Sequence, residues 1–269
     1  MILHVLNLGL VPYETALQLQ RTLMELRKAS RIENTLLLLE HPPVITLGRN
    51  AQVSNVLASP EFLAQRGVEL FDIDRGGDVT FHGPGQLVAY PIFDLRRFEP
   101  KLGAVEFVRR LEEVLIRTCG DFGIATQRIK GLTGVWTYAL RSKPEAKIAA
   151  LGVHISRGVT THGFALNVGT DLDFFSLIVP CGIAGRPVTS MERRLQKPLT
   201  MEEVATAASR NFGRVFQSQM LWLESLDDLL AQATVAPKPE PAESPANQDT
   251  PARPPEELRK LHGDDCERA

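Results

Sequence analysis

The chain has 269 residues, of which 43% are hydrophobic and 23% are charged, with a formal net charge of −2 at pH 7. These values are typical of a soluble globular protein of one or two domains. They give no general affinity for nucleic acid, and no apolar run is long enough to span a bilayer. We therefore expect neither nucleic acid nor a membrane among the partners.

The three cysteines, Cys119, Cys181 and Cys266, form no CxxC motif and no paired spacing. This usage argues against a disulfide framework or a zinc site and is typical of a reducing cytosol. The first residues contain neither a basic region nor a cleavage site, so they predict a strand rather than a signal peptide. No cluster of His, Asp or Glu has metal-ligand spacing. We expect a cytoplasmic protein that uses no metal and no cofactor.

The last 35 residues, 235–269, differ in composition from the rest of the chain. They contain seven prolines, eight acidic residues, five basic residues and no aromatic residue. Such a segment buries too little apolar area to offset the entropy lost on ordering. We therefore predict a catalytic domain over residues 1–234, followed by a disordered, proline-rich acidic tail over 235–269.

Residues 1–234 have the periodicity of regular secondary structure. Apolar runs bounded by proline or glycine predict strands, whereas apolar residues spaced three or four apart predict helices. The predicted elements in chain order are a strand at 1–6, a helix at 14–28, strands at 35–40, 44–47 and 86–93, a helix at 103–119, strands at 146–155 and 159–168, and a helix from 200 to about 217. Because strands and helices mix without regular βαβ alternation, we predict an α+β fold, a single domain with helices packed on a mostly antiparallel mixed sheet.

Three local patterns add detail to this prediction. The run Ser156-Arg157-Gly158 between two β-rich segments predicts a hairpin. Residues 189–192 and 200–203 each match the capping-box pattern of a helix start. The helix at 103–119 is expected to bury one face formed by Ala104, Val108, Leu111, Leu115 and Thr118.

Residues 75–87 are unusually rich in residues that permit tight backbone geometry. Gly76, Gly77, Gly83, Pro84 and Gly85 surround a short β-branched piece. Glycine permits a ligand to lie against bare backbone, and proline restricts its own φ. The spacing fits neither a P-loop nor a dinucleotide-binding fingerprint. A plain hairpin turn is the alternative, but the run predicts a wall of a binding site.

Cys181 lies in the run Val179-Pro180-Cys181-Gly182-Ile183. The flanking proline and glycine remove side-chain bulk, which leaves the sulfur accessible. A thiol is an effective nucleophile only as a thiolate, so a nearby cation or helix N-terminus must lower its usual pKa of about 8.5. The alternative is that Cys181 is a buried packing residue.

Lys147 is the leading candidate for that cation, because it borders an otherwise apolar run from Ile148 to Val153. A lysine that is partly desolvated beside a sheet can serve a Cys–Lys pair. Alternatively its ammonium group extends into solvent. His82 and His162, each followed by glycine, keep a Cys–His pair open, although a structural histidine in a turn is more common.

Six motifs in order make the chain resemble the lipoyl(octanoyl) transferases, the octanoyl-[acyl-carrier-protein]:protein N-octanoyltransferases. They cover roughly residues 1–215. The motifs are 40–48 (EHPPVITLG), 75–91 (from Arg75 to Pro91), 134–136 (GVW), 147–153 (KIAALGV), 161–168 (THGFALNV) and 180–183 (PCGI). The resemblance implies the fold of biotin and lipoate protein ligases, with a sheet-lined acyl pocket.

The resemblance also implies a two-step mechanism that begins endogenous protein lipoylation. Cys181 would take the acyl group from octanoyl-acyl carrier protein as a thioester, and Lys147 would lower the pKa of the thiol and move protons. A lysine of an apo lipoyl domain, on an E2 subunit or on glycine cleavage H protein, would then accept the octanoyl group as an amide. Backbone N–H groups near Gly76-Gly77 or around Cys181 are candidates to stabilise the oxyanion.

The implied substrate-contact residues fall in three segments of the sequence. They are Arg75, Gly76, Gly77, Asp78, Val79, Thr80, Phe81, His82, Ala150, Leu151, Gly152, Gly163, Phe164 and Ala165.

Three alternatives remain open from the sequence. An ATP-dependent lipoate–protein ligase of the same fold would leave Cys181 without a role. An octanoyl relay between lipoyl domains would differ only in its donor. A non-catalytic acyl-binding protein would tolerate the substitution Cys181→Ser.

Overall fold

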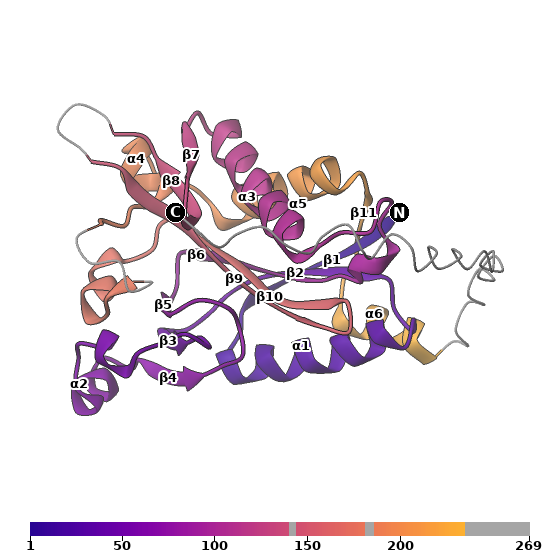
Figure 1. Ribbon diagram of the computed structural model, residues 1–269, viewed down its shortest axis with the longest axis horizontal. Helices are drawn as coiled ribbons and strands as arrows, with labels where there is room; N and C mark the ends of the chain where they lie inside the picture. Colours follow the sequence, from indigo (N-terminus) through magenta and orange to yellow (C-terminus); the bar gives the residue numbers. More distant parts are fainter. Residues whose placement is uncertain (140–143, 181–185, 235–269) are drawn as a thin grey trace, which may run out of the picture. The chain divides into compact units, whose positions relative to one another are not determined.

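The computed structural model describes residues 1–139, 144–180 and 186–234 (Figure 1). Cys181 and the predicted tail at 235–269 lie outside these residues. Over the described ranges, no helix combines the length and the hydropathy that crossing a bilayer requires.

Eight of the described strands form one large mixed sheet in the order β11-β1-β2-β6-β10-β9-β8-β7. Their bounds are β1 (Ile2–Leu10), β2 (Asn34–Glu40), β6 (Gln86–Ile92), β7 (Thr126–Ile129), β8 (Leu132–Thr137), β9 (Ala146–Ser156), β10 (Val159–Asn167) and β11 (Gln219–Trp222). The pairs β11–β1 and β1–β2 are parallel, whereas the remaining neighbours are antiparallel. The predicted α+β class with a mostly antiparallel sheet is confirmed.

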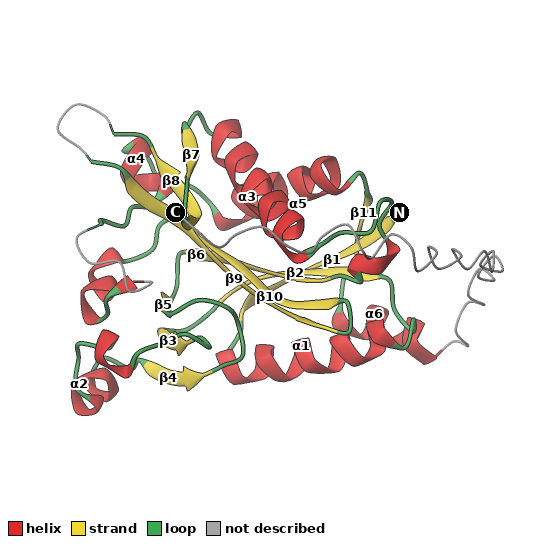
Figure 2. Ribbon diagram, in the orientation of Figure 1, coloured by secondary structure: helices red, strands yellow, loops and turns green. Residues whose placement is uncertain are grey.

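One face of this sheet is covered by α3 (Ala104–Asp121), α4 (Met191–Leu195) and α5 (Met201–Phe216) (Figure 2). Aromatic side chains dominate the contact, because Phe93 lies 5.3 Å from Phe216 and Phe164 lies 5.8 Å from Phe212, between ring centroids. Burying such rings contributes several kcal/mol each, on the order of 2–3, to the stability of this layer.

The other face is covered by α1 (Tyr13–Lys28) and α6 (Leu226–Thr234). Aliphatic residues fill this layer, among them Leu23 from α1, Leu37 from β2 and Leu229 from α6. Strand β2 is buried along almost its whole length, which explains its continuous apolar sequence.

A second sheet of three strands packs beside the beginning of α1. Its strands are β3 (Val44–Leu47), β4 (Glu69–Asp72) and β5 (Val79–His82), in the order β4-β3-β5. Tyr13 and Leu17 of α1 contact Val44 of this sheet. The short helix α2 (Pro60–Gln65) and the 3₁₀ turns η1 (Val53–Asn55), η2 (Leu95–Arg97) and η3 (Leu172–Leu177) complete the connections.

Most predicted elements are confirmed within a few residues, including the β9–β10 hairpin. Arg157 and Gly158 between these strands both have positive φ, at 48° and 83°, as a two-residue type I′ turn requires. The capping box at Thr200 and Glu203 is also present at the start of α5.

Two local predictions were wrong. Ala104 is exposed and Val108 is only half-buried, because α3 is oriented so that Phe107 packs in the aromatic core instead. The buried face therefore follows Phe107, Leu111, Val114, Leu115 and Thr118. At the start of α4 the N-cap is Ser190 rather than Thr189, because the Thr189 N–H donates to the Lys147 carbonyl, 2.9 Å away.

Candidate active site

A cavity of about 300 Å³ lies between the large sheet and the strand β5 of the small sheet. Strands β6, β9 and β10 form one wall, and residues 77–82 form another. Lys147 lines this cavity, as do twelve of the fourteen predicted substrate-contact residues. These twelve are Arg75, Gly77, Asp78, Val79, Thr80, His82, Ala150, Leu151, Gly152, Gly163, Phe164 and Ala165.

The sheet side of the cavity is made by small residues in register. Gly163 of β10 pairs with Gly152 of β9, and Ala165 pairs with Ala150. Phe164 between them also belongs to the cavity lining, but because neighbouring side chains alternate between faces its ring packs against Phe212 on the opposite side. A Cβ at Gly163 would collide with the carbonyl oxygen of Ala89 and the ring of Pro91, so glycine is required there. The cavity therefore exists because this face of the strands carries almost no side-chain bulk.

Lys147, the second residue of β9, is only 6% exposed. Its backbone N–H donates to the Pro187 carbonyl and its carbonyl accepts from the Thr189 N–H, both at 2.9 Å. Its Nζ lies 5.0 Å from the centre of the Trp136 ring, a cation–π distance. The guanidinium of Arg186 lies 5.4 Å from the same ring. The side chains of Lys147 and Arg186 thus both contact the Trp136 ring, beside the cavity.

His82 is held as a neutral ring with a defined tautomer. Gln86 donates from Nε2 to the Phe81 carbonyl, so its Oε1 is the acceptor that faces His82 Nδ1, 2.8 Å away. His82 Nδ1 therefore carries the proton. Burial in the protein lowers the pKa of His82 to about 3, so the ring is uncharged at neutral pH.

Tyr90 and His82, which line the cavity, both lie against a second buried histidine, His41. His41 bonds the Val11 carbonyl through Nδ1 and the Tyr90 hydroxyl through Nε2, both at 2.7 Å. Burial lowers the pKa of His41 to about 4 and raises the pKa of Tyr90 above its usual value. Tyr90 therefore presents a neutral, hydrogen-bonded ring where it lines the cavity.

His162 lies at another edge of the cavity and bonds Asp74, with 2.8 Å between Nε2 and Oδ1. The hydrogen bond from His162 lowers the pKa of Asp74 to about 2. Burial, in turn, lowers the pKa of His162. The backbone of His162 has a positive φ of 56°, and its N–H donates to Gln20 Oε1. It is thus held by α1 as well as by Asp74.

Residues 75–78 are hydrogen-bonded to three elements, which are β3, η1 and β9. Arg75 is buried and donates from Nη2 to the carbonyl of Thr46 at 2.8 Å. Asp78 accepts from Asn55 Nδ2 at 2.6 Å. The Gly76 N–H donates to the Val153 carbonyl at 3.0 Å, so it is not available to an oxyanion. An oxyanion role for the other backbone N–H groups near Gly76-Gly77 or around Cys181 stays a prediction.

Two of the predicted substrate-contact residues do not line the cavity. Gly76 bonds β9 through its N–H, and Phe81 stacks on Phe174 with 4.7 Å between ring centroids. Alternation along β5 places Phe81 on the far side from Thr80 and His82. Cys181 lies outside the described residues. The catalytic and substrate-contact roles stay predictions.

Sequence reasoning missed several residues that line the cavity. They are Tyr13, Val88, Tyr90, Gly131, Leu132 and Thr133. Alternation along β6 could have indicated Val88 and Tyr90, whereas the turn at 131–133 gave no local signal. Within the described ranges, no three His, Cys, Asp or Glu side chains come together as a metal site requires.

The family described as "Lipoyl protein ligase A/B catalytic domain" matches residues 12–213. A protein named "Octanoyltransferase" from Koribacter versatilis (strain Ellin345) is 64% identical over 263 residues, which cover 98% of both chains. Another of that name, from Acidobacterium capsulatum, is 62% identical over 239 residues and covers 86% of this chain and 97% of that one.

Solved structures of lipoate protein ligases share the fold. A bipartite lipoate protein ligase from Thermoplasma acidophilum has a TM-score of 0.67 at 17% identity and covers 87% of this chain and 91% of its own. A lipoate-protein ligase A bound with ATP has a TM-score of 0.66 at 16% identity, over 87% of this chain and 93% of its own.

These matches define the class of the protein, which is an acyltransferase with the lipoate protein ligase fold. The chain belongs to the Lipoyl protein ligase A/B catalytic domain family. The resemblance inferred from the six motifs is confirmed.

Proposed function

We propose that the chain transfers an octanoyl group from octanoyl-acyl carrier protein to the ε-amine of a lysine on a lipoyl domain, through a thioester on Cys181. Octanoyl transfer for protein lipoylation is supported by the relatives named octanoyltransferase, which match most of the chain. The observation that carries the proposal is the cavity itself, a space of about 300 Å³ with Lys147 in its wall.

The cavity suits a thin, apolar chain. Its sheet side presents Gly152, Gly163, Ala150 and Ala165, which leave room for methylene groups against the sheet. The rings of His82 and Tyr90, which line the cavity, are neutral because burial disfavours their charged forms. An octanoyl chain that leaves water along these residues would meet small side chains and neutral rings, and burial of each CH₂ contributes about 0.8 kcal/mol.

The chemistry balances without ATP. In the first step the Cys181 thiolate attacks the donor carbonyl, a new C–S bond forms, and the carrier thiol leaves with a proton. In the second step the acceptor amine attacks the Cys181 thioester. The C–S bond then breaks, an amide forms, and the amine gives up a proton while the Cys181 thiol is restored. The first step exchanges one thioester for another. The second step is downhill because an amide is more stable than a thioester.

Lys147 rather than a histidine is the proposed partner of Cys181. A partner that favours the thiolate must be positively charged. His82, with a pKa of about 3, and His162, whose pKa burial also lowers, are both uncharged at neutral pH. These neutral rings argue against a Cys–His pair as the source of positive charge.

The described residues on both sides of Cys181 support this pairing. Pro180, which precedes Cys181 in the chain, lines a second small cavity of about 10 Å³ together with Lys147. Val188, which follows, lines the same space and pairs with Lys147 in a parallel β-bridge. The chain therefore lies near Lys147 at Pro180, before Cys181, and again at Val188, after it.

The test is the intact mass of the full-length protein after incubation with octanoyl-acyl carrier protein and no ATP. We expect the wild type to gain one octanoyl group and to lose it to an apo lipoyl domain. Cys181→Ser should gain none. Lys147→Met should acylate far more slowly, whereas Lys197→Met, at an exposed lysine, should match the wild type.

The other outcomes identify other functions. Attachment of free octanoate that requires ATP would indicate a lipoate–protein ligase. Transfer from an octanoylated lipoyl domain, but not from acyl carrier protein, would indicate an octanoyl relay. Binding of the acyl donor without transfer in any condition would indicate an acyl-binding protein.

A further inference from the structure

Helix α3 buries a carboxylate in the middle of its apolar face. Glu112 is 0% exposed, between Leu111 and Val114, which belong to the aromatic core cluster. An isolated buried charge is costly, and even a paired one contributes little to stability compared with well-packed apolar residues. A carboxylate at this position therefore calls for a role other than packing.

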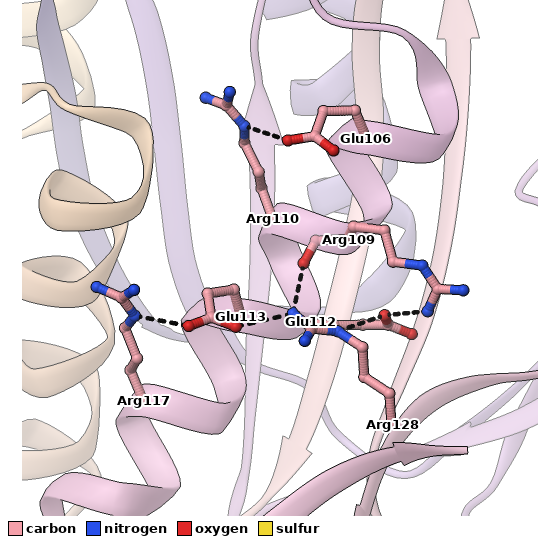
Figure 3. Close-up of polar contacts among 7 residues, drawn as sticks. All are labelled: Glu106, Arg109, Arg110, Glu112, Glu113, Arg117 and Arg128. Carbon is pink, nitrogen blue, oxygen red and sulfur yellow. Dashed lines mark hydrogen bonds and ion pairs between the residues drawn. The ribbon is translucent and has the colours of Figure 1, made fainter. Parts of the chain in front are cut away.

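Three donors from three elements converge on Glu112, and Figure 3 shows the two that are arginine side chains, Arg109 and Arg128. Its Oε2 accepts from Arg109 Nη1 at 2.7 Å, within α3, and from Arg128 Nε at 3.1 Å, on β7. Its Oε1 accepts from the backbone N–H of Gly134 at 3.2 Å, on β8. One side chain thus fixes α3, β7 and β8 relative to one another.

Gly134 is in direct contact with Lys147. It has a φ of +127°, and a Cβ built on it would lie 3.1 Å from Lys147 Cε and 2.9 Å from the Ala149 carbonyl oxygen. The stem of the lysine therefore rests on the bare backbone of Gly134. The register between β8 and β9 shifts just beyond this point, between Val135 and Trp136, so regular pairing alone does not set the position of the lysine.

We propose that Glu112 is a positioning residue for Lys147 and acts through the backbone of Gly134. The proposal rests on the role that the proposed function gives to Lys147. Arg109 and Arg128 hold the carboxylate, the carboxylate holds the Gly134 N–H, and Gly134 with Trp136 confines the ammonium group at the cavity wall. A small shift in such a support moves the reacting group, and a misplacement of about 1 Å can slow a reaction as much as a hundredfold.

Glutamine cannot replace the carboxylate at this site. Its amide has one oxygen, whereas the two sides of the Glu112 carboxylate both face N–H donors. If the oxygen of Glu112→Gln faces the arginines, its NH₂ group faces the Gly134 N–H, and the opposite orientation sets it against Arg109 and Arg128. The substitution keeps the shape of the side chain and removes one of the two acceptor sides.

Glu113 supplies a matched control on the next residue. It accepts from Arg117 at 2.9 Å and from Arg128 at 2.9 Å but has no hydrogen bond to β8 among those that the structure describes. Glu113→Gln therefore removes the same charge and disturbs the same arginine without touching the Gly134 contact.

The experiment compares the full-length wild type with Glu112→Gln, Glu113→Gln and Lys147→Met. The first measurement is single-turnover acylation by octanoyl-acyl carrier protein over a range of donor concentrations. We expect the maximal rate of Glu112→Gln to fall about tenfold with an unchanged half-saturating concentration, since positioning affects the reacting geometry and not donor binding. Glu113→Gln should stay within about twofold of the wild type.

The second measurement needs no acyl donor. The rate at which iodoacetamide alkylates Cys181 reports its thiolate fraction, with the modified residue located by peptide mass. We expect Lys147→Met and Glu112→Gln to slow alkylation and Glu113→Gln to leave it unchanged. Equal behaviour of Glu112→Gln and Glu113→Gln, while Lys147→Met slows both reactions, would overturn the positioning role. Failure of the proposed function looks different, because the wild type would then form no adduct and Lys147→Met would not affect alkylation.

If Glu112→Gln does not fold, Gly134→Ala tests the same contact from its other end. Gly123→Ala is its control, because Gly123 also has positive φ, at 78°, but a Cβ there meets nothing within 4 Å. We expect Gly134→Ala alone to slow acylation and alkylation. Equal rates in the two alanine variants would contradict the proposal.

Discussion

The two faces of the large sheet are built from the same strands but in opposite ways. On the side of α3 and α5, Phe164 of β10 stacks on Phe212 within an aromatic core. On the other side the neighbouring residues of the same strand, Gly163 and Ala165, line a cavity of about 300 Å³. Alternation along one strand thus separates a filled face from the part of the other face that is left open as the cavity.

This difference shows how a rigid sheet can form the wall of a cavity. Close packing on the aromatic side fixes the strands, so the cavity side does not need bulky residues to hold its shape. The small residues there cost hydrophobic stability, which the opposite face supplies. Stability and the proposed acyl binding can therefore be changed independently by substitutions one residue apart.

The largest effect is expected from Phe212→Ala on the filled face. Phe212 is fully buried and contacts Phe93, Phe164 and Phe216. Removal of the ring leaves a hole, and we expect the free energy of unfolding to fall by about 3–5 kcal/mol. Urea unfolding measures the change. A loss below about 1 kcal/mol would mean that the aromatic face does not carry the stability of the sheet.

Ala165→Leu on the open face should affect the reaction instead. The larger side chain enters the cavity, so we expect octanoyl transfer to slow by about a hundredfold, as added methylenes in a substrate pocket do. The comparison is Ala89→Leu, because Ala89 belongs to the filled core and pairs with Phe164. Overpacking there should cost about 1–3 kcal/mol of unfolding free energy. Equal losses of stability in both variants would contradict the distinction between the faces.

The open face should also make the stability depend on pH. The pKa of His41 falls from 6.5 to about 4 on folding and that of His82 to about 3, both through burial. Below pH 6.5 the unfolded chain binds more protons than the folded one, so stability is full above that pH and decreases toward pH 4. Each histidine contributes about 1.4 kcal/mol per pH unit in this window.

Urea unfolding at several pH values measures this slope. His82→Gln should reduce the slope of stability against pH by the contribution of one histidine, which is about 1.4 kcal/mol per pH unit. On the filled face, burial raises the pKa of Cys119 to about 12, which lies far outside the window and adds nothing to the slope. A stability that does not change between about pH 6.5 and 4.5 would contradict the buried neutral state of these rings.

The smallest effect is expected at the end of a helix on the filled face. Thr200 caps α5, where its hydroxyl accepts from the Glu203 N–H at 3.2 Å. We expect Thr200→Ala to lower the free energy of unfolding by about 1 kcal/mol and to leave octanoyl transfer unchanged. Because aromatic packing holds α5, a loss comparable to that of Phe212→Ala would show that the cap matters more than the packing.

The main elements of the fold could be predicted because their signals are local. The continuous apolar run of β2, the proline before α1 and the capping box of α5 each specify an element without reference to the rest of the chain. The strands β4, β5, β7, β8 and β11 were not predicted. In β4 and in β11, three of the four residues are exposed. These two strands exist because they pair with β3 and β1.

The rotation of α3 and the start of α4 could not be read from spacing. Several registers of the apolar residues fit α3, and the aromatic core selected the one that buries Phe107. Thr189 matched a capping box, but its backbone was already paired with Lys147, a partner more than forty positions away. In both cases a tertiary contact outweighed a weak local preference.

The sequence alone determined the fold class and the family, because the periodicity of helices and strands and the six ordered motifs are properties of the sequence itself. It also pointed to glycine-rich and small-residue segments, which line the cavity. Only the tertiary structure decided which neighbours face the cavity, why Phe81 does not, and how Glu112 reaches Gly134 behind Lys147. These depend on which face of a strand meets which element, and that is set by packing between segments distant in the sequence.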